Sequence, residues 1–177
     1  PVMADDEREV EEMVSIASSL VINIGTLNSR TVQSMLLAGK RANKLNIPVV
    51  LDPVGVGATS YRTEVAKKLI EEVHFSVIRG NLSEIKNIAG IKVVTKGVDT
   101  SEIGDTSSKM KDEKEIAQQL SKKLNAVIAI TGEVDCVSSK DKNYYIANGH
   151  KILSEITGTG CMCSSLIGSF CGAESDY

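Results

Sequence analysis

The chain has 177 residues, 42% of them hydrophobic, and a formal charge of −3. This length suits one compact domain over residues 1–177. Mild acidity, no basic cluster, only two Phe and no Trp argue against a nucleic-acid partner. No apolar run approaches the roughly 20 residues that span a bilayer, and no signal-peptide pattern opens the chain, so we expect no membrane partner.

The first half of the chain alternates helical periods with short apolar runs. Apolar runs without polar alternation are typical of strands buried on both faces of a sheet. Asn28 or Ser29 is expected to cap a helix, because both side chains accept hydrogen bonds from a helix N-terminus. The expected elements are a helix at 7–18, a strand at 20–24, a helix to about 45, a strand at 48–52, a loop at 53–59 and a helix at 61–73.

The second half continues this alternation and adds a hairpin. The expected elements are a strand at 75–78, a helix at 81–89 closed by Gly90, a polar surface excursion at 91–112, a helix at 113–124, a strand at 126–131 and a hairpin of 135–138 with 144–147. Strands that alternate with helices predict a parallel sheet with helices on both faces, the α/β class. We find no internal repeat and expect one domain.

Polar residues gather where the predicted strands end. Asp52 follows one strand, Arg79 and Asn81 follow another, with Glu84 one turn further on, and Thr131 follows a third. Ligands of parallel sheets bind beyond the carboxyl ends of the strands. Carboxylates suit a hard cation such as Mg²⁺, and an arginine fork suits phosphate, so the set indicates a magnesium–nucleotide site.

A glycine-punctuated turn, Gly158-Thr159-Gly160, leads into a small-residue helix that begins around Cys161. Glycines allow close approach of a ligand, and the first turn of a helix attracts anions. The same field favours negative charge on Cys161. An anion cradle that contains a potential base suggests phosphoryl transfer. A tight turn before a buried helix with an inert cysteine explains this segment equally well by itself.

Each strand-end residue also has a structural explanation. Asp52 before Pro53 suits a turn, Asn81 with Glu84 suits a reciprocal helix cap, and Arg79 suits a surface charge. It is their occurrence at successive strand ends that favours a site. No G-x-x-x-x-G-K-[ST] motif occurs and no G-x-G-x-x-G follows a strand, so a P-loop enzyme or dinucleotide-dependent dehydrogenase is not supported.

The cysteines indicate the compartment. Positions 136, 161, 163 and 171 follow no spacing typical of a disulfide-stapled secreted scaffold, so we expect a cytoplasmic setting. Cys161 and Cys163 form C-x-C, but residues two apart on a helix diverge by about 200°, and zinc is not expected. The chain begins at Pro1 and stops soon after the last helix, so we expect further structure at both ends.

Several of these segments, taken in order, resemble the hydroxyethylthiazole kinase family. The segments are Asp52–Ala58, Arg79–Asn81 with Glu84, Thr131–Asp135, Asn148–His150 and Gly158–Cys161. The resemblance covers nearly the whole chain. It implies a ribokinase-like three-layer α/β/α fold with a central, mostly parallel sheet and helices on both faces. It also implies ATP- and Mg²⁺-dependent phosphorylation of the hydroxyethyl alcohol of 4-methyl-5-(2-hydroxyethyl)thiazole, in thiamine biosynthesis and salvage.

The resemblance further implies roles for the nucleotide and metal. Arg79, Thr131 and Asn81 match positions that bind ATP. Glu84, in the Asn-x-x-Glu motif, and Asp52, near the phosphates, match positions that hold Mg²⁺.

On the substrate side, Cys161 falls where most ribokinase-like enzymes have an aspartate as general base, and cysteine is this family's own residue there. Met3 and Gly158 match positions that line the thiazole pocket. In the family this pocket lies between subunits of a homotrimer, so a homotrimer is the implied assembly.

The chain departs from the family pattern in three places: a segment before Pro1 and C-terminal helices are missing, and the excursion at 97–112 is longer than usual. The nearest alternative function is another ribokinase-like kinase, such as one acting on hydroxymethylpyrimidine. The others are a thiol-dependent redox or acyl-transfer enzyme that uses Cys161, and a binding or assembly fragment without activity.

Overall fold

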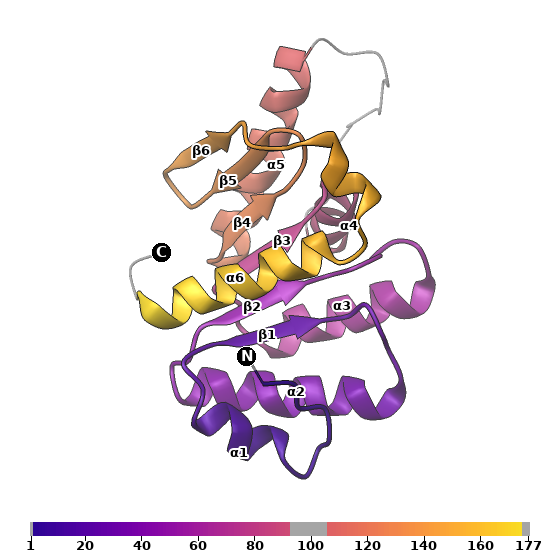
Figure 1. Ribbon diagram of the computed structural model, residues 1–177, viewed down its shortest axis with the longest axis vertical. Helices are drawn as coiled ribbons and strands as arrows, with labels where there is room; N and C mark the ends of the chain where they lie inside the picture. The colour runs from indigo at the N-terminus through magenta and orange to yellow at the C-terminus, as the bar shows by residue number, and fades with distance from the viewer. Residues whose placement is uncertain (1, 93–105, 175–177) are drawn as a thin grey trace.

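A computed structural model describes residues 2–92 and 106–174 of the chain (Figure 1). One six-stranded sheet runs in chain order from β1 to β6. β1 to β4 are parallel to one another, and β5 and β6 follow at the far edge, each antiparallel to the strand before it. The strands are β1 (Leu20–Asn23), β2 (Val49–Asp52), β3 (Val77–Gly80), β4 (Val127–Ile130), β5 (Asp135–Ser138) and β6 (Asn143–Ile146). The mostly parallel sheet and the hairpin are therefore confirmed.

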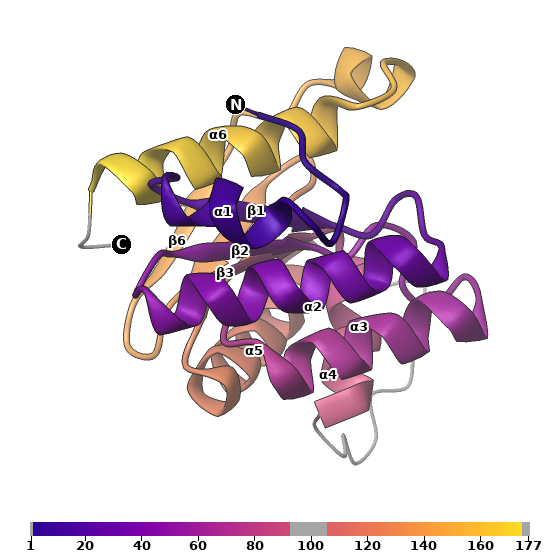
Figure 2. The ribbon, with the colours of Figure 1, turned by 90° about the horizontal axis from the view of Figure 1, so that it is seen from below.

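Helices cover both faces of the sheet and make three layers (Figure 2). α2, α3, α4 and α5 lie on one face and α6 on the other. Crossovers between parallel strands are right-handed, so helices that link strands laid down in chain order fall on the same face. The helices are α1 (Val10–Ser15), α2 (Ser29–Lys44), α3 (Ser60–Glu72), α4 (Leu82–Lys92), α5 (Thr106–Leu124), α6 (Thr159–Ala173) and the 3₁₀ turn η1 (Lys151–Glu155).

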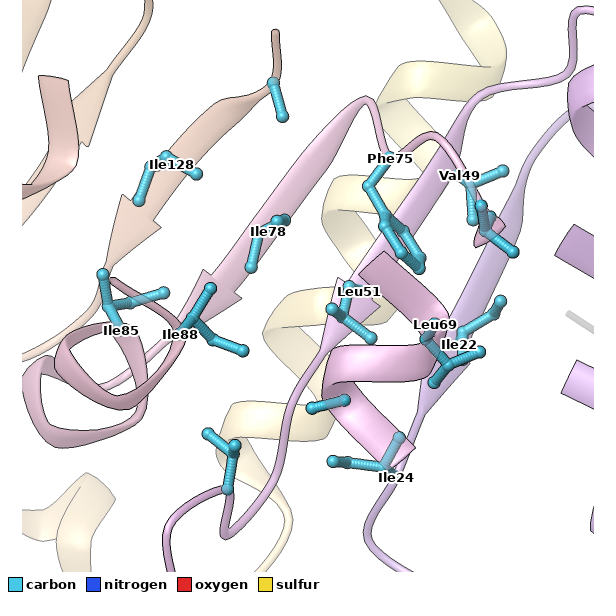
Figure 3. Packing of buried hydrophobic residues seen from close by; sticks show 14 of the residues in the cluster. Ile22, Ile24, Val49, Leu51, Leu69, Phe75, Ile78, Ile85, Ile88 and Ile128 are labelled. Atoms are coloured by element: carbon cyan, nitrogen blue, oxygen red, sulfur yellow. The ribbon is translucent and has the colours of Figure 1, made fainter. Parts of the chain in front are cut away.

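The main core lies between the sheet and the four-helix face (Figure 3). Its centre is a row of side chains in register across four strands: Ile22, Leu51, Ile78 and Ile128. Leu69 of α3 and Ile85 and Ile88 of α4 are fully buried against this face. Burial of large aliphatic side chains contributes about 1.5–3 kcal/mol each, and this layer holds the sheet to its helices.

A smaller core lies under α6. Val50, Val77 and Cys171 are buried there, with Val21, Val127 and Ile167 packed against them. The four valines are also in register across β1 to β4. Since residues two apart in a strand face the same side, the next residues along each strand on this face lie beside the start of α6.

Two expected boundaries are wrong. The third strand begins at Val77 and ends at Gly80, so Arg79 is inside the strand and not beyond its end. The following helix continues through Gly90 to Lys92. A lone glycine costs a helix about 1 kcal/mol, and the buried residues Ile85, Ile88 and Ala89 on the same helix offset that cost.

The expected surface excursion is also shortened. Residues 106–112 belong to α5, and residues 93–105 lie outside the described part of the chain. The sequence at 106–112 has no apolar period, but a helix extends readily once a packed part has nucleated it. That packed part is the predicted helix at 113–124, with Ala117 and Leu120 in the core. At the other end of the chain, the expected helix at 7–18 is reduced to α1.

The predicted cap of α2 is confirmed. Asn28 accepts a hydrogen bond from the Thr31 amide, and Thr31 accepts one from the Asn28 amide, which makes a reciprocal cap. Within the described residues, no helix has both the length and the apolar character needed to cross a membrane.

Candidate active site

The site begins where the valine row under α6 gives way to polar residues. Two positions beyond Val21, Val50 and Val77 on the same face lie Asn23, Asp52 and Arg79. Asn23 and Asp52 are direct partners across β1 and β2. Thr131 follows β4 directly and is on this face too, because it is two residues beyond Ala129, the partner of Arg79. The parallel sheet thus brings side chains from four strands to one edge.

Arg79 is the centre of this group. Its Nη2 donates to Oγ1 of Thr131 at 2.5 Å, and its Nη1 lies 3.8 Å from Oδ1 of Asp52. The guanidinium also lies against the first turn of α6, where a Cβ at Gly160 would come within 2.7 Å of Nη1. Gly160 is therefore needed for this close approach. The predicted convergence of these segments is present in the structure.

Asp52 is a buried carboxylate with a free acceptor. Its residue is 1% exposed, and Oδ1 has no hydrogen-bond partner among the described residues. Burial raises the pKa of the Asp52 carboxyl, while the neighbouring Ser164 and the charge of Arg79 lower it. A buried acceptor without a donor has a free-energy cost, so a cation or donor at Oδ1 would be stabilised there.

Asn81 and Glu84 form the reciprocal cap at the start of α4. The Glu84 amide donates to Oδ1 of Asn81, and the Asn81 amide donates to Oε2 of Glu84. The other oxygen of Glu84, Oε1, accepts from the amide of Gly55 in the loop after β2. The capping explanation from the sequence is therefore correct, and the same carboxylate also fixes the loop that follows Asp52.

Cys161 lies in the first turn of α6, after Gly158 with a left-handed φ of 92°. The N-terminus of α6, with its free backbone amides, lies at this edge of the sheet. These amides and the helix dipole together create an electric field that attracts anions. Sγ of Cys161 accepts a hydrogen bond from Nδ2 of Asn23 at 3.2 Å. Asn23 in turn donates to Oδ2 of Asp52, so Cys161 and Asp52 share one amide.

The structure adds two residues that the sequence analysis did not select. Asn23 ends the first strand, and a polar residue at the end of an apolar run was the available signal. Arg62, on α3, donates to the carbonyl oxygens of Ile24, Gly25 and Val54. It holds together the loops after β1 and β2, and no short motif marks it.

Met3 and Gly158 are not part of this network. The Met3 residue is 97% exposed on the segment before α1. A Cβ at Gly158 would meet open space. The thiazole pocket expected at these two residues is thus not closed within one chain.

Comparisons with known proteins agree with this arrangement. The hydroxyethylthiazole kinase family matches residues 1–177. The chain is 59% identical over 177 residues to hydroxyethylthiazole kinase of Clostridium tetani, covering 100% of this chain and 64% of that protein. It is 60% identical over 172 residues to the one of Alkaliphilus oremlandii, covering 97% and 62%. The chain therefore spans less than two thirds of the length of these relatives.

Solved structures give the same result. A hydroxyethylthiazole kinase protein from Pyrococcus horikoshii superposes with a TM-score of 0.86 at 37% identity, covering 98% of this chain and 62% of that one. A ribokinase-like superfamily protein from Enterococcus faecalis, at 14% identity and a TM-score of 0.62 over 93% and 51%, shows the shared fold alone. With the α/β/α layers, the strand-edge site and the family match over its whole length, the chain belongs to the hydroxyethylthiazole kinase family.

Proposed function

We propose that this chain takes part in the transfer of the γ-phosphoryl group of ATP to the hydroxyethyl alcohol of 4-methyl-5-(2-hydroxyethyl)thiazole, in thiamine biosynthesis and salvage. The observation that carries the proposal is the convergence of Asp52, Arg79, Thr131 and Cys161 at one edge of the sheet. It supplies a phosphate-binding fork, a carboxylate and a nucleophile-activating group within one site.

Arg79, Thr131 and Asn81 are the proposed ATP-binding residues. The guanidinium of Arg79 is held by Thr131 with a side-chain exposure of only 13%, so its charge is poorly screened and already oriented. In phosphoryl transfer, positioning and neutralisation of charge account for most of the rate. The first turn of α6 adds free backbone amides that suit phosphate oxygens.

Asp52 and Glu84 are the proposed residues for Mg²⁺. Within the described residues, no group of three or more His, Cys, Asp or Glu could hold a metal ion. Mg²⁺ usually binds through one or two carboxylates, with waters and substrate phosphates completing its shell. The free Oδ1 of Asp52 fits that requirement, and Glu84 keeps lone pairs that could accept from a metal-bound water. When bound, Mg²⁺ would neutralise phosphate charge.

Cys161 is the proposed general base. Its Sγ takes the proton of the substrate alcohol while the alcohol oxygen forms a bond to the γ-phosphorus and the bond to the ADP oxygen breaks. A loose transition state gathers little charge on the attacking oxygen, so the base contributes toward the low end of the usual 10²–10⁴-fold, about 10²-fold. Met3 and Gly158 are the proposed thiazole-pocket residues, and the open position of Met3 supports a pocket shared between subunits of a homotrimer.

The cytoplasm is the proposed location. The four cysteines are free, and unpaired thiols are typical of reducing compartments.

The test is ADP release by a protein that carries this sequence at the full length of its relatives, with and without the thiazole alcohol. We expect release to depend on the alcohol and on Mg²⁺. Arg79→Ala should lower kcat by about 10³-fold or more, and Cys161→Ala by about 10²-fold. Cys161→Asp should retain activity, because an aspartate is charged at neutral pH without assistance. Lys67→Ala, at an exposed position of α3, is the control and should be unchanged.

Two outcomes would contradict the proposal. ADP release that depends on hydroxymethylpyrimidine and not on the thiazole alcohol would assign a different ribokinase-like activity. A complete loss in Cys161→Ala with ATP binding intact would overturn the ranking of Arg79 above Cys161.

A further inference from the structure

Asn23, the last residue of β1, makes three hydrogen bonds within the candidate site. Its Oδ1 accepts from the Gly25 amide at 2.8 Å. Its Nδ2 donates to Oδ2 of Asp52 at 2.9 Å and to Sγ of Cys161 at 3.2 Å. The side chain thus joins the ends of β1, β2 and α6, elements separated by up to 138 residues in sequence.

These bonds determine the orientation of the amide. An asparagine amide has two N–H donors and an oxygen that only accepts. The Gly25 amide can only donate, so Oδ1 must face it, and both N–H groups must face Asp52 and Cys161. The reversed amide would place two donors together at Gly25 and an oxygen against the carboxylate of Asp52, which removes all three bonds.

The two acceptors of Asn23 lie on different elements, β2 and α6. One amide nitrogen carries two N–H groups, so it can bind both acceptors at once and fix how they lie relative to each other. The other charge at this position is Arg79, which pairs with Asp52 and lies against Gly160 at the start of α6. Within the described part of the chain, the side-chain donor to the sulfur of Cys161 is Asn23 and not Arg79.

We propose that Asn23 is a positioning residue that holds Sγ of Cys161 in the candidate site through the same amide nitrogen that donates to Asp52. This role rests on the proposed function, because it prepares Cys161 to accept the alcohol proton. Asn23 itself acts through Cys161 and Asp52.

The test compares two asparagines that undergo the same change. In Asn23→Asp the size and the bond to Gly25 are kept, but a carboxylate replaces the donor toward Cys161. In the control, Asn28→Asp, the side chain is an acceptor at the cap of α2, and aspartate caps a helix as well as asparagine does. Asn23→Ala removes the donor without adding charge. All variants carry Cys163→Ser, so that iodoacetamide labelling of this segment reports on Cys161.

Two readouts are expected to change together. The rate of Cys161 labelling at one fixed pH should change by about threefold to tenfold in both Asn23 variants, because the sulfur loses the hydrogen bond that holds it in place. The kcat should fall by about 10- to 100-fold, the range of a weakened general base, while KM for ATP stays within about threefold. Asn28→Asp should match the parent protein in both.

The remaining outcomes would overturn either the role of Asn23 or the proposed function. A folded Asn23 variant that is labelled at the parent's rate would overturn the proposal, whatever its kcat. Loss of folding in both Asn23 variants, with Asn28→Asp folded, would also overturn it and make Asn23 structural. If the labelling rate changes but the parent protein releases no ADP with the thiazole alcohol, the positioning role stands and the proposed function fails.

Discussion

At the scale of single residues, the candidate site arises from a change of residue type along one face of the sheet. Valines hold α6 to the sheet, and two positions further on the same strands carry Asn23, Asp52 and Arg79. The polar groups are therefore placed by the same strand register that packs the small core. A side chain on such a rigid strand loses little freedom when it binds a ligand.

Gly160 is predicted to be sensitive to a single methyl group. In Gly160→Ala the new Cβ would lie 2.7 Å from Nη1 of Arg79, so the guanidinium must move and its bond to Thr131 weakens. We expect a loss of about tenfold or more in kcat/KM for ATP in the ADP-release assay, the effect of one misplaced charged hydrogen bond. Gly90→Ala, at an open position of α4, is the control.

The control variant Gly90→Ala is itself expected to change the stability of the protein. Alanine suits a helix interior better than glycine, so Gly90→Ala should increase the free energy of unfolding by about 0.4–1 kcal/mol and leave activity unchanged. Equal activity of Gly160→Ala and Gly90→Ala would show that Arg79 does not need its present position.

Asp52 is predicted to reduce stability at neutral pH. Burial raises the pKa of its carboxyl above the ordinary value of 3.8. The folded protein then binds this proton more tightly than the unfolded chain does. The stabilisation that comes from binding this proton is fully present below the pKa that the carboxyl has in the unfolded chain. It is lost as the pH rises through the pKa that the carboxyl has in the folded protein. Asp52→Asn should therefore become more stable, relative to the parent protein, as the pH is raised from about 3 to 7.

Urea unfolding at a series of pH values measures this difference, and the ADP-release assay should show that Asp52→Asn is inactive. Asp112→Asn, an exposed site on α5, controls for the loss of one negative charge. If the advantage of Asp52→Asn were to shrink as the pH rises, the carboxylate would be stabilising and this account of its burial would be wrong.

At the scale of elements, two helices of the main layer hold the loops that surround the site. Arg62 of α3 binds carbonyl oxygens of the loops after β1 and β2, at 3.1 Å for Ile24 and 2.8 Å for Gly25. Glu84 of α4 binds the Gly55 amide in the second loop. Loops at the edge of a sheet are otherwise its most mobile parts. These contacts explain how a site made of strand ends stays ordered.

Arg62 is predicted to stabilise the fold and the site together. Arg62→Ala should lower the free energy of unfolding by about 1–3 kcal/mol, because three partly buried carbonyl oxygens lose a charged donor. Arg62→Lys should restore little, since a single ammonium lacks the planar fork that reaches several carbonyls. Lys67→Ala, exposed on the same helix, is the control. Urea unfolding measures all three, and full rescue by lysine would contradict this role.

At the scale of the whole molecule, the two faces of the sheet have different roles: one holds the main core, and the other positions the helix that carries Cys161. The four-helix face contains most of the buried aliphatic side chains. Among residues 2–92 and 106–174, the helix that covers the other face is α6, and its packing determines where Cys161 lies. The tight contact at Gly168, where a Cβ would lie 2.5 Å from Cγ2 of Val21, sets how closely α6 approaches the sheet.

Gly168→Ala is therefore predicted to affect stability and activity together. Valine is stiff, so α6 must move away from the sheet, and overpacking of this kind costs about 1–3 kcal/mol. We expect a lower midpoint of urea unfolding and a lower kcat, because Cys161 moves with the helix. Ser169→Ala, the exposed neighbour, should change neither. A stable Gly168→Ala protein with low activity would separate the two effects and contradict a common cause.

The order of the elements, the mostly parallel sheet, the cap at Asn28 and the position of Asp52 at the end of its strand were all predictable from the sequence. These features depend on neighbouring residues: apolar runs, capping side chains and glycines act over a few positions. The end of α4 and the start of α5 were not predictable from the sequence. Gly90 and residues 106–112 do not favour a helix by themselves, but buried residues elsewhere on the same two helices stabilise them.

Only the tertiary structure decided that Asn23 serves both Asp52 and Cys161, and that Arg62 joins two loops. Register pairs Asn23 with Asp52, and the packing of α6 brings Cys161 to the same amide from 138 positions away. The direction of an amide group and the approach of a distant helix are set by long-range packing, which no local pattern of residues encodes.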